Sequence, residues 1–201
     1  MSLSQWIALV GSVLLAPMAL AAPVIENPSF EADRYGEYPG YASGNGGRIA
    51  GWQFTGNVGL NPCWADPETP AGPRHAFSDN GVIPHRRQVA LMQNQCALSQ
   101  EVAGFESGKK YRVTYHENAR HYRRGKDLPR IAVLLGGETV VSEHAVAAKE
   151  PMGRHTLPYD VVESAVFTAP SSGAFDLIFK TTVGNGVTML IDNVAIVEVA
   201  E

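Results

Sequence analysis

Short runs of alternating polar and apolar residues, separated by glycine, proline, asparagine and aspartate, fill the chain after residue 23. Such runs are typical of β-strands, because successive side chains of a strand point to opposite faces. Helical periodicity is almost absent from the same region, which excludes coiled coils and helical arrays. The candidate strands are 24–30, 51–54, 88–93, 98–102, 111–118, 131–135, 139–142, 161–168, 175–181 and 189–199. Nine or ten strands bounded by turns predict an all-β fold, a two-sheet antiparallel jelly-roll sandwich with one core.

The first 22 residues differ from the rest of the 201-residue chain. An apolar run from Trp6 to Ala22 ends in Ala19-Leu20-Ala21, which matches an A-x-A cleavage site. No Lys or Arg precedes this run, which departs from the usual signal peptide, and Pro17 interrupts it before it reaches bilayer-spanning length. We expect residues 1–22 to be a secretory signal peptide, with a membrane anchor as the alternative. Residues 23–201 are expected to form a single domain.

Charge and hydropathy limit the partners of the mature chain. It has no apolar run near 20 residues, so we expect no membrane span and a soluble protein that is secreted or periplasmic. Sixteen Lys and Arg against 20 Asp and Glu give a formal charge of −4, and nucleic-acid binding needs a clustered basic surface instead. The sequence does not predict the oligomeric state.

The chain contains two cysteines, Cys63 and Cys96. In an oxidising compartment an even pair most simply forms one disulfide, and no further metal ligands lie near either residue in the sequence. The predicted bridge ties the loop after Asn61 to the end of the 88–93 strand, with two free thiols as the alternative.

Four motifs occur in a characteristic order along the mature chain. They are NPSFE at 27–31, GW at 51–52, ESGKK at 106–110 directly before a strand, and LIDNV at 190–194. In this order they resemble carbohydrate-binding modules of the galactose-binding-like β-sandwich superfamily, whose first strand reads N-x-x-F-E and whose last reads I-D-N-V. The resemblance covers nearly the whole mature chain and implies a galactose-binding-like jelly roll. It leaves the function open, because this sandwich includes sugar-binding, adhesive and some catalytic members.

The resemblance also implies a structural calcium ion. In many such modules the Glu of the opening motif and the Asp of the closing motif lie side by side, which corresponds here to Glu31 and Asp192. Ca²⁺ takes six to eight hard oxygen ligands, so an ion bound by two carboxylates and by backbone carbonyls can hold the two ends of the domain together. The alternative is that Glu31 is a solvated strand-end residue and Asp192 a turn or pairing residue.

The strand at 111–120 predicts a binding face. Strand alternation places Tyr111, Val113 and Tyr115 in the core and turns His116, Asn118 and Arg120 to the other face. On a concave sheet this row would suit sugar hydroxyls or carboxylates, but the solvated face of any antiparallel sheet also alternates in this way.

Other polar and aromatic residues extend the predicted site. Gln93 is expected to add hydrogen bonds, and Trp64 and Tyr122 are candidate platforms for the C–H face of a sugar, whereas Trp52 is expected in the core. Basic clusters at 74–75, 85–87 and 121–130 would favour an anionic glycan if they converge, although such runs are more often solvated loops. Tyrosines 35, 38 and 41 are further candidate platforms.

No catalytic signature is present in the sequence. It lacks the G-x-S-x-G, H-E-x-x-H and phosphate-loop motifs, so we assign no catalytic residue and favour a non-enzyme. We predict a secreted carbohydrate-binding protein that recognises a polysaccharide, with anionic polymers among the candidates, on a concave sheet face and adjoining loops. One alternative is a polysaccharide lyase that uses His116, Asn118, Arg120 and Tyr122 on a uronate polymer. Another is an extracellular adhesive or matrix protein that binds a second protein.

Overall fold

The structure is a computed structural model, and it describes residues 22–35, 40–44, 46–62, 83–120, 127–149, 159–184 and 186–200. These residues form nine strands and one short 3₁₀ turn, η1 (Ala42–Gly44), and contain no α-helix. The strands are β1 (Gln53–Pro62), β2 (Gln88–Phe105), β3 (Lys110–Ala119), β4 (Arg130–Leu135), β5 (Glu138–Ala145), β6 (Asp160–Glu163), β7 (Phe167–Thr168), β8 (Gly173–Thr181) and β9 (Thr188–Glu198). The predicted all-β fold is confirmed. Within these ranges no helix is long and apolar enough to cross a bilayer.

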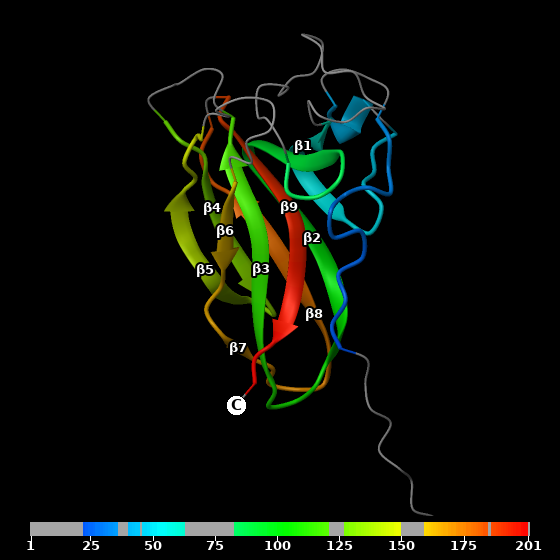
Figure 1. Cartoon of the computed structure of the whole chain (residues 1–201), viewed down its shortest axis with the longest axis vertical. Helices are drawn as coiled ribbons and strands as arrows, with labels where there is room; N and C mark the ends of the chain where they lie inside the picture. The colour runs from blue at the N-terminus through cyan, green and yellow to red at the C-terminus, as the bar shows by residue number, and fades with distance from the viewer. Residues whose placement is uncertain are drawn as a thin grey trace, which may run out of the picture.

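The strands form two layers that share β2. Every neighbouring pair is antiparallel, and the order is β5-β4-β8-β2-β9-β3-β6, with β1 paired to β2 and β7 to β3. The second half of β2, from Cys96, pairs with β8, whereas Ala90–Gln93 pair with β9. We call β5-β4-β8 with the second half of β2 the β8 sheet, and the first half of β2 with β9-β3-β6 the β3 sheet. In Figure 1, β3 and β9 lie in front of β8.

The core lies between these two sheets and follows the predicted alternation. Tyr111, Val113 and Tyr115 of β3 are buried, as is every second residue of β4. The ring of Tyr115 meets the edge of Phe179 from β8, with ring centroids 5.1 Å apart. Trp52 is 5 % exposed and also packs on Phe179, which confirms its predicted core position.

Two predicted strands join into one, and one does not form. The runs at 88–93 and 98–102 are parts of the 18-residue β2, which bends at Asn94, where φ is +61°. Residues 24–30 form turns instead of a strand, because Pro28 has no N–H to donate and Phe30 closes a turn onto the carbonyl of Asn27. The run at 161–168 divides into β6 and β7.

The N-terminal segment is nevertheless fixed to the sandwich by Gln100 of β2. The buried side-chain amide of Gln100 accepts a hydrogen bond from Glu26 N and donates to the carbonyls of Glu26 and Gly51. These side-chain hydrogen bonds take the place of the backbone hydrogen bonds that a strand would have formed, so the opening motif has a defined position beside β2.

Candidate functional site

The predicted row on β3 lies on the outer face of the β3 sheet. Strand register places Asn118 opposite Leu190 of β9 and Gln93 of β2 opposite Thr188. Because the backbone N–H of Arg120 donates to the carbonyl of Thr188, Arg120 lies level with Gln93. The structure therefore brings His116, Asn118, Arg120 and Gln93 onto one face of one sheet.

Asn118, however, is a structural residue of that face. Asn118 is 1 % exposed, and its Oδ1 accepts hydrogen bonds from Ala119 N and Lys149 N. Its Nδ2 donates to the carbonyl of Lys149 at 3.3 Å. The amide thus holds the segment after β5 against β3, and Asn118 has little surface left for a ligand.

A second apolar cluster covers the centre of the same face. Tyr41 packs against five buried members of this cluster, which are Ile83, Val89, Leu91, Tyr159 and Leu190. The predicted concave groove is therefore filled at these positions, and His116, Arg120 and Gln93 remain half-buried around it. Gln93 accepts a hydrogen bond from the Tyr41 hydroxyl at 2.5 Å and donates to the Thr188 hydroxyl.

His116 is half-buried, and three other residues with predicted roles lie outside the described ranges. Burial lowers the pKa of His116, whose Nδ1 is buried without a hydrogen-bond partner. Trp64, Tyr122 and Cys63 lie outside the described residues, so their predicted roles stay predictions.

The predicted disulfide is not formed, because Cys96 is a free, buried cysteine. Pairing of β1 with β2 places Pro62, which precedes Cys63 in the chain, opposite Gln88. Gln88 lies eight residues along β2 from Cys96, roughly 25 Å at the usual strand rise. A disulfide joins Cα atoms about 4.4 to 6.8 Å apart, so this register does not favour the predicted bridge.

Glu31 and Asp192, the residues expected to bind calcium, meet at the segment that leads into β2. Oε1 of Glu31 accepts hydrogen bonds from Arg87 N and Gln88 N, and Oδ2 of Asp192 accepts one from His85 N. Asp192 is fully buried, and this burial, with a contribution from the charge of Glu31, raises its pKa to about 8. The opening and closing motifs therefore adjoin in space, as the resemblance implies.

This carboxylate pair has features that fit a cation. Oε2 of Glu31 is buried and accepts no hydrogen bond, and it lies 3.1 Å from Nε of Arg87. Two buried carboxylates side by side destabilise one another unless a positive charge or a proton lies between them. The described ranges contain no group of three or more His, Cys, Asp and Glu side chains that could hold a metal ion, so backbone carbonyls and water would have to complete the shell of a hard ion.

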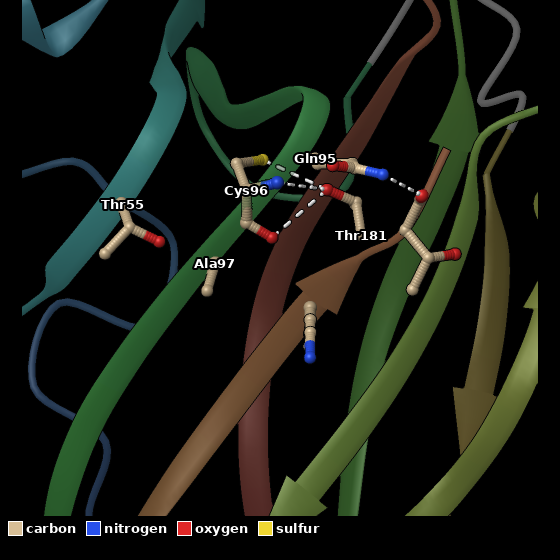
Figure 2. A pocket seen from close by; sticks show the side chains of 7 residues that line it. Thr55, Gln95, Cys96, Ala97 and Thr181 are labelled. Carbon is tan, nitrogen blue, oxygen red and sulfur yellow. Dashed lines mark hydrogen bonds between the residues drawn. The ribbon is translucent and has the colours of Figure 1, made fainter. Parts of the chain in front are cut away.

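An open pocket lies at the second half of β2, beside the end of β8. It has a volume of about 410 Å³. Its described lining residues are Thr55, Gln95, Cys96, Ala97, Lys180, Thr181 and Thr182. Figure 2 shows that Thr55 comes from β1, Cys96 and Ala97 from β2, and Thr181 from β8. Strand pairing explains the hollow, because Lys180 lies between two alanines, Ala97 on β2 and Ala132 on β4.

The pocket combines a buried floor with exposed polar groups. Thr181 accepts a hydrogen bond from Cys96 N and donates to the carbonyl of Asn94, and its Oγ1 lies 3.1 Å from the Cys96 Sγ (Figure 2). Burial raises the pKa of the Cys96 thiol. Lys180, Thr55 and Gln95 are exposed at the rim. The floor is thus rigid and neutral, and the positive charge of the pocket comes from Lys180.

Sequence reasoning did not identify this pocket. Alternation along 175–181 could have placed Lys180 on the outer face of its strand, but the neighbouring alanines belong to strands far away in the sequence. Only the register of three strands shows that small residues flank this lysine.

Comparisons with known proteins identify the fold. No protein-family model and no curated protein matches the sequence. Among solved structures, the module TmCBM61, determined in complex with β-1,4-galactotriose, matches 89 % of this chain and 100 % of its own, with a TM-score of 0.54 and 15 % identity. The family 22 carbohydrate-binding module from the C-terminal part of Clostridium thermocellum Xyn10B matches 91 % of this chain and 97 % of its own, with a TM-score of 0.46 and 12 % identity. The chain therefore has the β-sandwich fold of carbohydrate-binding modules.

Proposed function

We propose that this protein is a secreted or periplasmic carbohydrate-binding protein that binds a saccharide without transforming it. The observation that carries the proposal is the match of the chain to the entire length of a sandwich module that binds β-1,4-galactotriose. Export rests on the predicted signal peptide at residues 1–22.

The pocket beside β8 is the proposed binding site. Its volume of about 410 Å³ lies in the lower part of the range of small-molecule sites, about 300 to 1,000 Å³. The hydroxyl group of Thr55 can donate to and accept from sugar hydroxyls, whereas that of Thr182 donates to the carboxylate of Glu143 and is left as an acceptor. Nε2 of Gln95 already donates to the carbonyl of Thr182, which leaves Oε1 as an acceptor. Thr55 lies on β1, paired with β2, and the hydrogen bond from Gln95 to Thr182 links the other two groups, so the contacts of these side chains are set before the ligand arrives.

The outer face of the β3 sheet supports this choice of site. Its apolar cluster and the bound amide of Asn118 occupy the positions where the predicted sugar row would have formed a groove. Asn118 is also unsuited to neutralising a uronate carboxylate, so nothing in the described residues favours the lyase alternative over binding.

Calcium is the second part of the proposal. Glu31 through Oε2 and Asp192 through its carboxylate would hold the ion, together with carbonyls and water. Bound there, Ca²⁺ would replace the proton that the raised pKa of Asp192 favours and would join the N-terminal segment to the last strand. Its role is structural, because the pair lies in the junction of the chain ends and not among the lining residues of the pocket.

A retention assay tests the proposed function. The exported protein is applied to immobilised neutral and anionic polysaccharides, while absorbance at the wavelength of unsaturated uronates follows product release. We expect retention on at least one glycan without product. Product release would replace binding by the lyase alternative, and passage through every glycan column would favour the adhesive one.

A further inference from the structure

The charge of Lys180 distinguishes the pocket from an ordinary polar hollow. Within the described part of the chain Lys180 has no ion-pair partner, and it is exposed. The carboxylate of Glu143 reaches the pocket through a hydrogen bond with the side chain of Thr182, and its charge is paired with Nε of Arg130 at 2.7 Å. Because the charges of Glu143 and Arg130 cancel, the ammonium group of Lys180 gives the pocket its net positive charge.

Acidic residues on the same sheet lie beyond this ammonium group. Glu101 and Asp176 pair across β2 and β8, four residues along β8 from Lys180. At the rise of an antiparallel strand this separation is roughly 13 Å, which exceeds the Debye length of about 8 Å at physiological ionic strength. Ile178 lies between the two positions on the same face of β8. The positive potential at the pocket is therefore only weakly reduced by these carboxylates.

The described lining also lacks a platform for a neutral sugar. None of the seven lining residues is aromatic, whereas pyranose rings gain much of their binding energy when their C–H faces pack on aromatic side chains. Hydrogen bonds from threonine and glutamine to sugar hydroxyls replace similar bonds to water, so each contributes only about 0.5 to 1.5 kcal/mol. A ligand of this pocket needs a stronger contact than hydroxyl groups provide.

We propose that the pocket binds an anionic saccharide, whose carboxylate or sulfate group pairs with the ammonium group of Lys180. This inference rests on the proposed saccharide-binding function and adds the chemical class of the ligand. Ala97 and Ala132 beside Lys180 leave room for the acidic substituent to approach the strand surface. Thr55, Thr182 and Gln95 then orient the ring through its hydroxyls.

Matched probes separate the charge of the ligand from its shape. Trigalacturonic acid and its methyl ester share one α-1,4-linked backbone and differ only in a carboxylate against a neutral ester, whereas β-1,4-galactotriose is a neutral probe with the other linkage. A sulfated galactan oligosaccharide tests the other source of negative charge.

Dissociation constants for each probe are measured by titration calorimetry at low and high salt, with the wild-type protein and Lys180→Ala, Lys180→Arg and Lys110→Ala. Lys110 is an exposed lysine at the start of β3 and serves as the control. Thermal unfolding of each variant checks that it is folded.

The expected result is specific to one lysine. Lys180→Ala weakens binding of the charged probe about 10-fold to 100-fold, in the range of a lost charge-assisted hydrogen bond, and Lys180→Arg retains most of the affinity. The Lys110→Ala variant binds as the wild type does, and high salt weakens the wild type. Preference for trigalacturonic acid or for the sulfated probe identifies which anionic group the pocket accepts.

Three results would overturn the inference, and they differ from failure of the proposed function. Equal affinity of the wild type for charged and neutral probes, or unchanged affinity in Lys180→Ala, would show saccharide binding without a role for the charge. Absence of binding by all four probes, together with retention on another neutral glycan, would also refute the anionic ligand while the binding function stands. Loss of retention on every glycan would refute both.

Discussion

His144 and Glu117 join the two sheets at the level of single residues. Nε2 of His144 in β5 lies 2.8 Å from Oε1 of Glu117 in β3, and its Nδ1 lies 3.2 Å from the carbonyl of Ser142. Both ring nitrogens face acceptors, so only the doubly protonated imidazolium can donate to both. Glu117 is 6 % exposed and accepts a further hydrogen bond from the Tyr115 hydroxyl. Burial lowers the pKa of His144, but the hydrogen bond and the charge of Glu117 outweigh it, so the pKa is raised overall.

This pair predicts a pH-dependent contribution to stability. Because the folded pKa of His144 is raised above its unfolded value of about 6.5, the contribution is complete below that pH and is lost as the pH rises through the folded pKa. We expect the free energy of unfolding to fall between about pH 6 and pH 9 by a larger amount in the wild type than in His144→Asn. Urea unfolding at both pH values measures the difference. Glu117→Gln, which keeps the size of the side chain, should reduce the pH dependence in the same direction. A parallel pH profile in wild type and His144→Asn would contradict the pairing.

Strand β2 is the element that most affects both the core and the pocket. Its first half completes the β3 sheet and its second half completes the β8 sheet, with the change at Asn94. The sequence shows two apolar runs separated by Gln93–Gln95, which we predicted to be two strands. Their polar interruption is a bend, because Asn94 adopts positive φ and its side chain accepts a hydrogen bond from Gly186 N. The pocket lies directly after this bend.

The register of β1 on β2 predicts the state of the cysteines. Cys96 lies at the bend and is buried, and Pro62 pairs with Gln88 at the far end of β2. We expect both cysteines of the exported protein to be alkylated by iodoacetamide in denaturant without prior reduction, with Cys96 protected in the native state. Mass spectrometry of the peptides measures this, and Cys96→Ser serves as the control for peptide assignment. A peptide linked through Cys63 and Cys96 would instead restore the predicted disulfide and require a different pairing of β1.

At the scale of the whole molecule, the sequence predicted the fold better than the site. Alternation on β3 predicted which side chains enter the core, because burial has the period of the strand. Site prediction failed at Asn118, since alternation reports the face of a side chain but not what covers that face. Lys180 was missed because its environment depends on β2 and β4, which are distant in sequence. Glu31 and Asp192 were placed together only through a family resemblance.

Calcium binding at the junction of the chain ends affects the stability of the entire sandwich. Without a cation, the fully buried Asp192 must either carry a desolvated charge beside Glu31 or bind a proton. An ion that binds only the folded state stabilises it by about 2.7 kcal/mol at one hundred times its dissociation constant, which raises the melting temperature of a domain this size by roughly 5 to 10 °C. We therefore expect EDTA to lower the melting temperature of the wild type and Ca²⁺ to restore it.

Asp192→Asn separates this effect from other consequences of a divalent ion. The amide keeps the shape of the side chain and one oxygen acceptor, which can serve His85 N or Asn193 N but not both, and it removes the buried charge. Loss of one of these backbone contacts costs the variant some stability in EDTA, so the diagnostic result is its response to the ion: its melting temperature should gain little from Ca²⁺. Magnesium, which is smaller and demands a stricter octahedral shell, should stabilise the wild type less than calcium does. If Ca²⁺ leaves the melting temperature of the wild type unchanged, the guanidinium group of Arg87 beside Glu31 is the only cation that this junction needs.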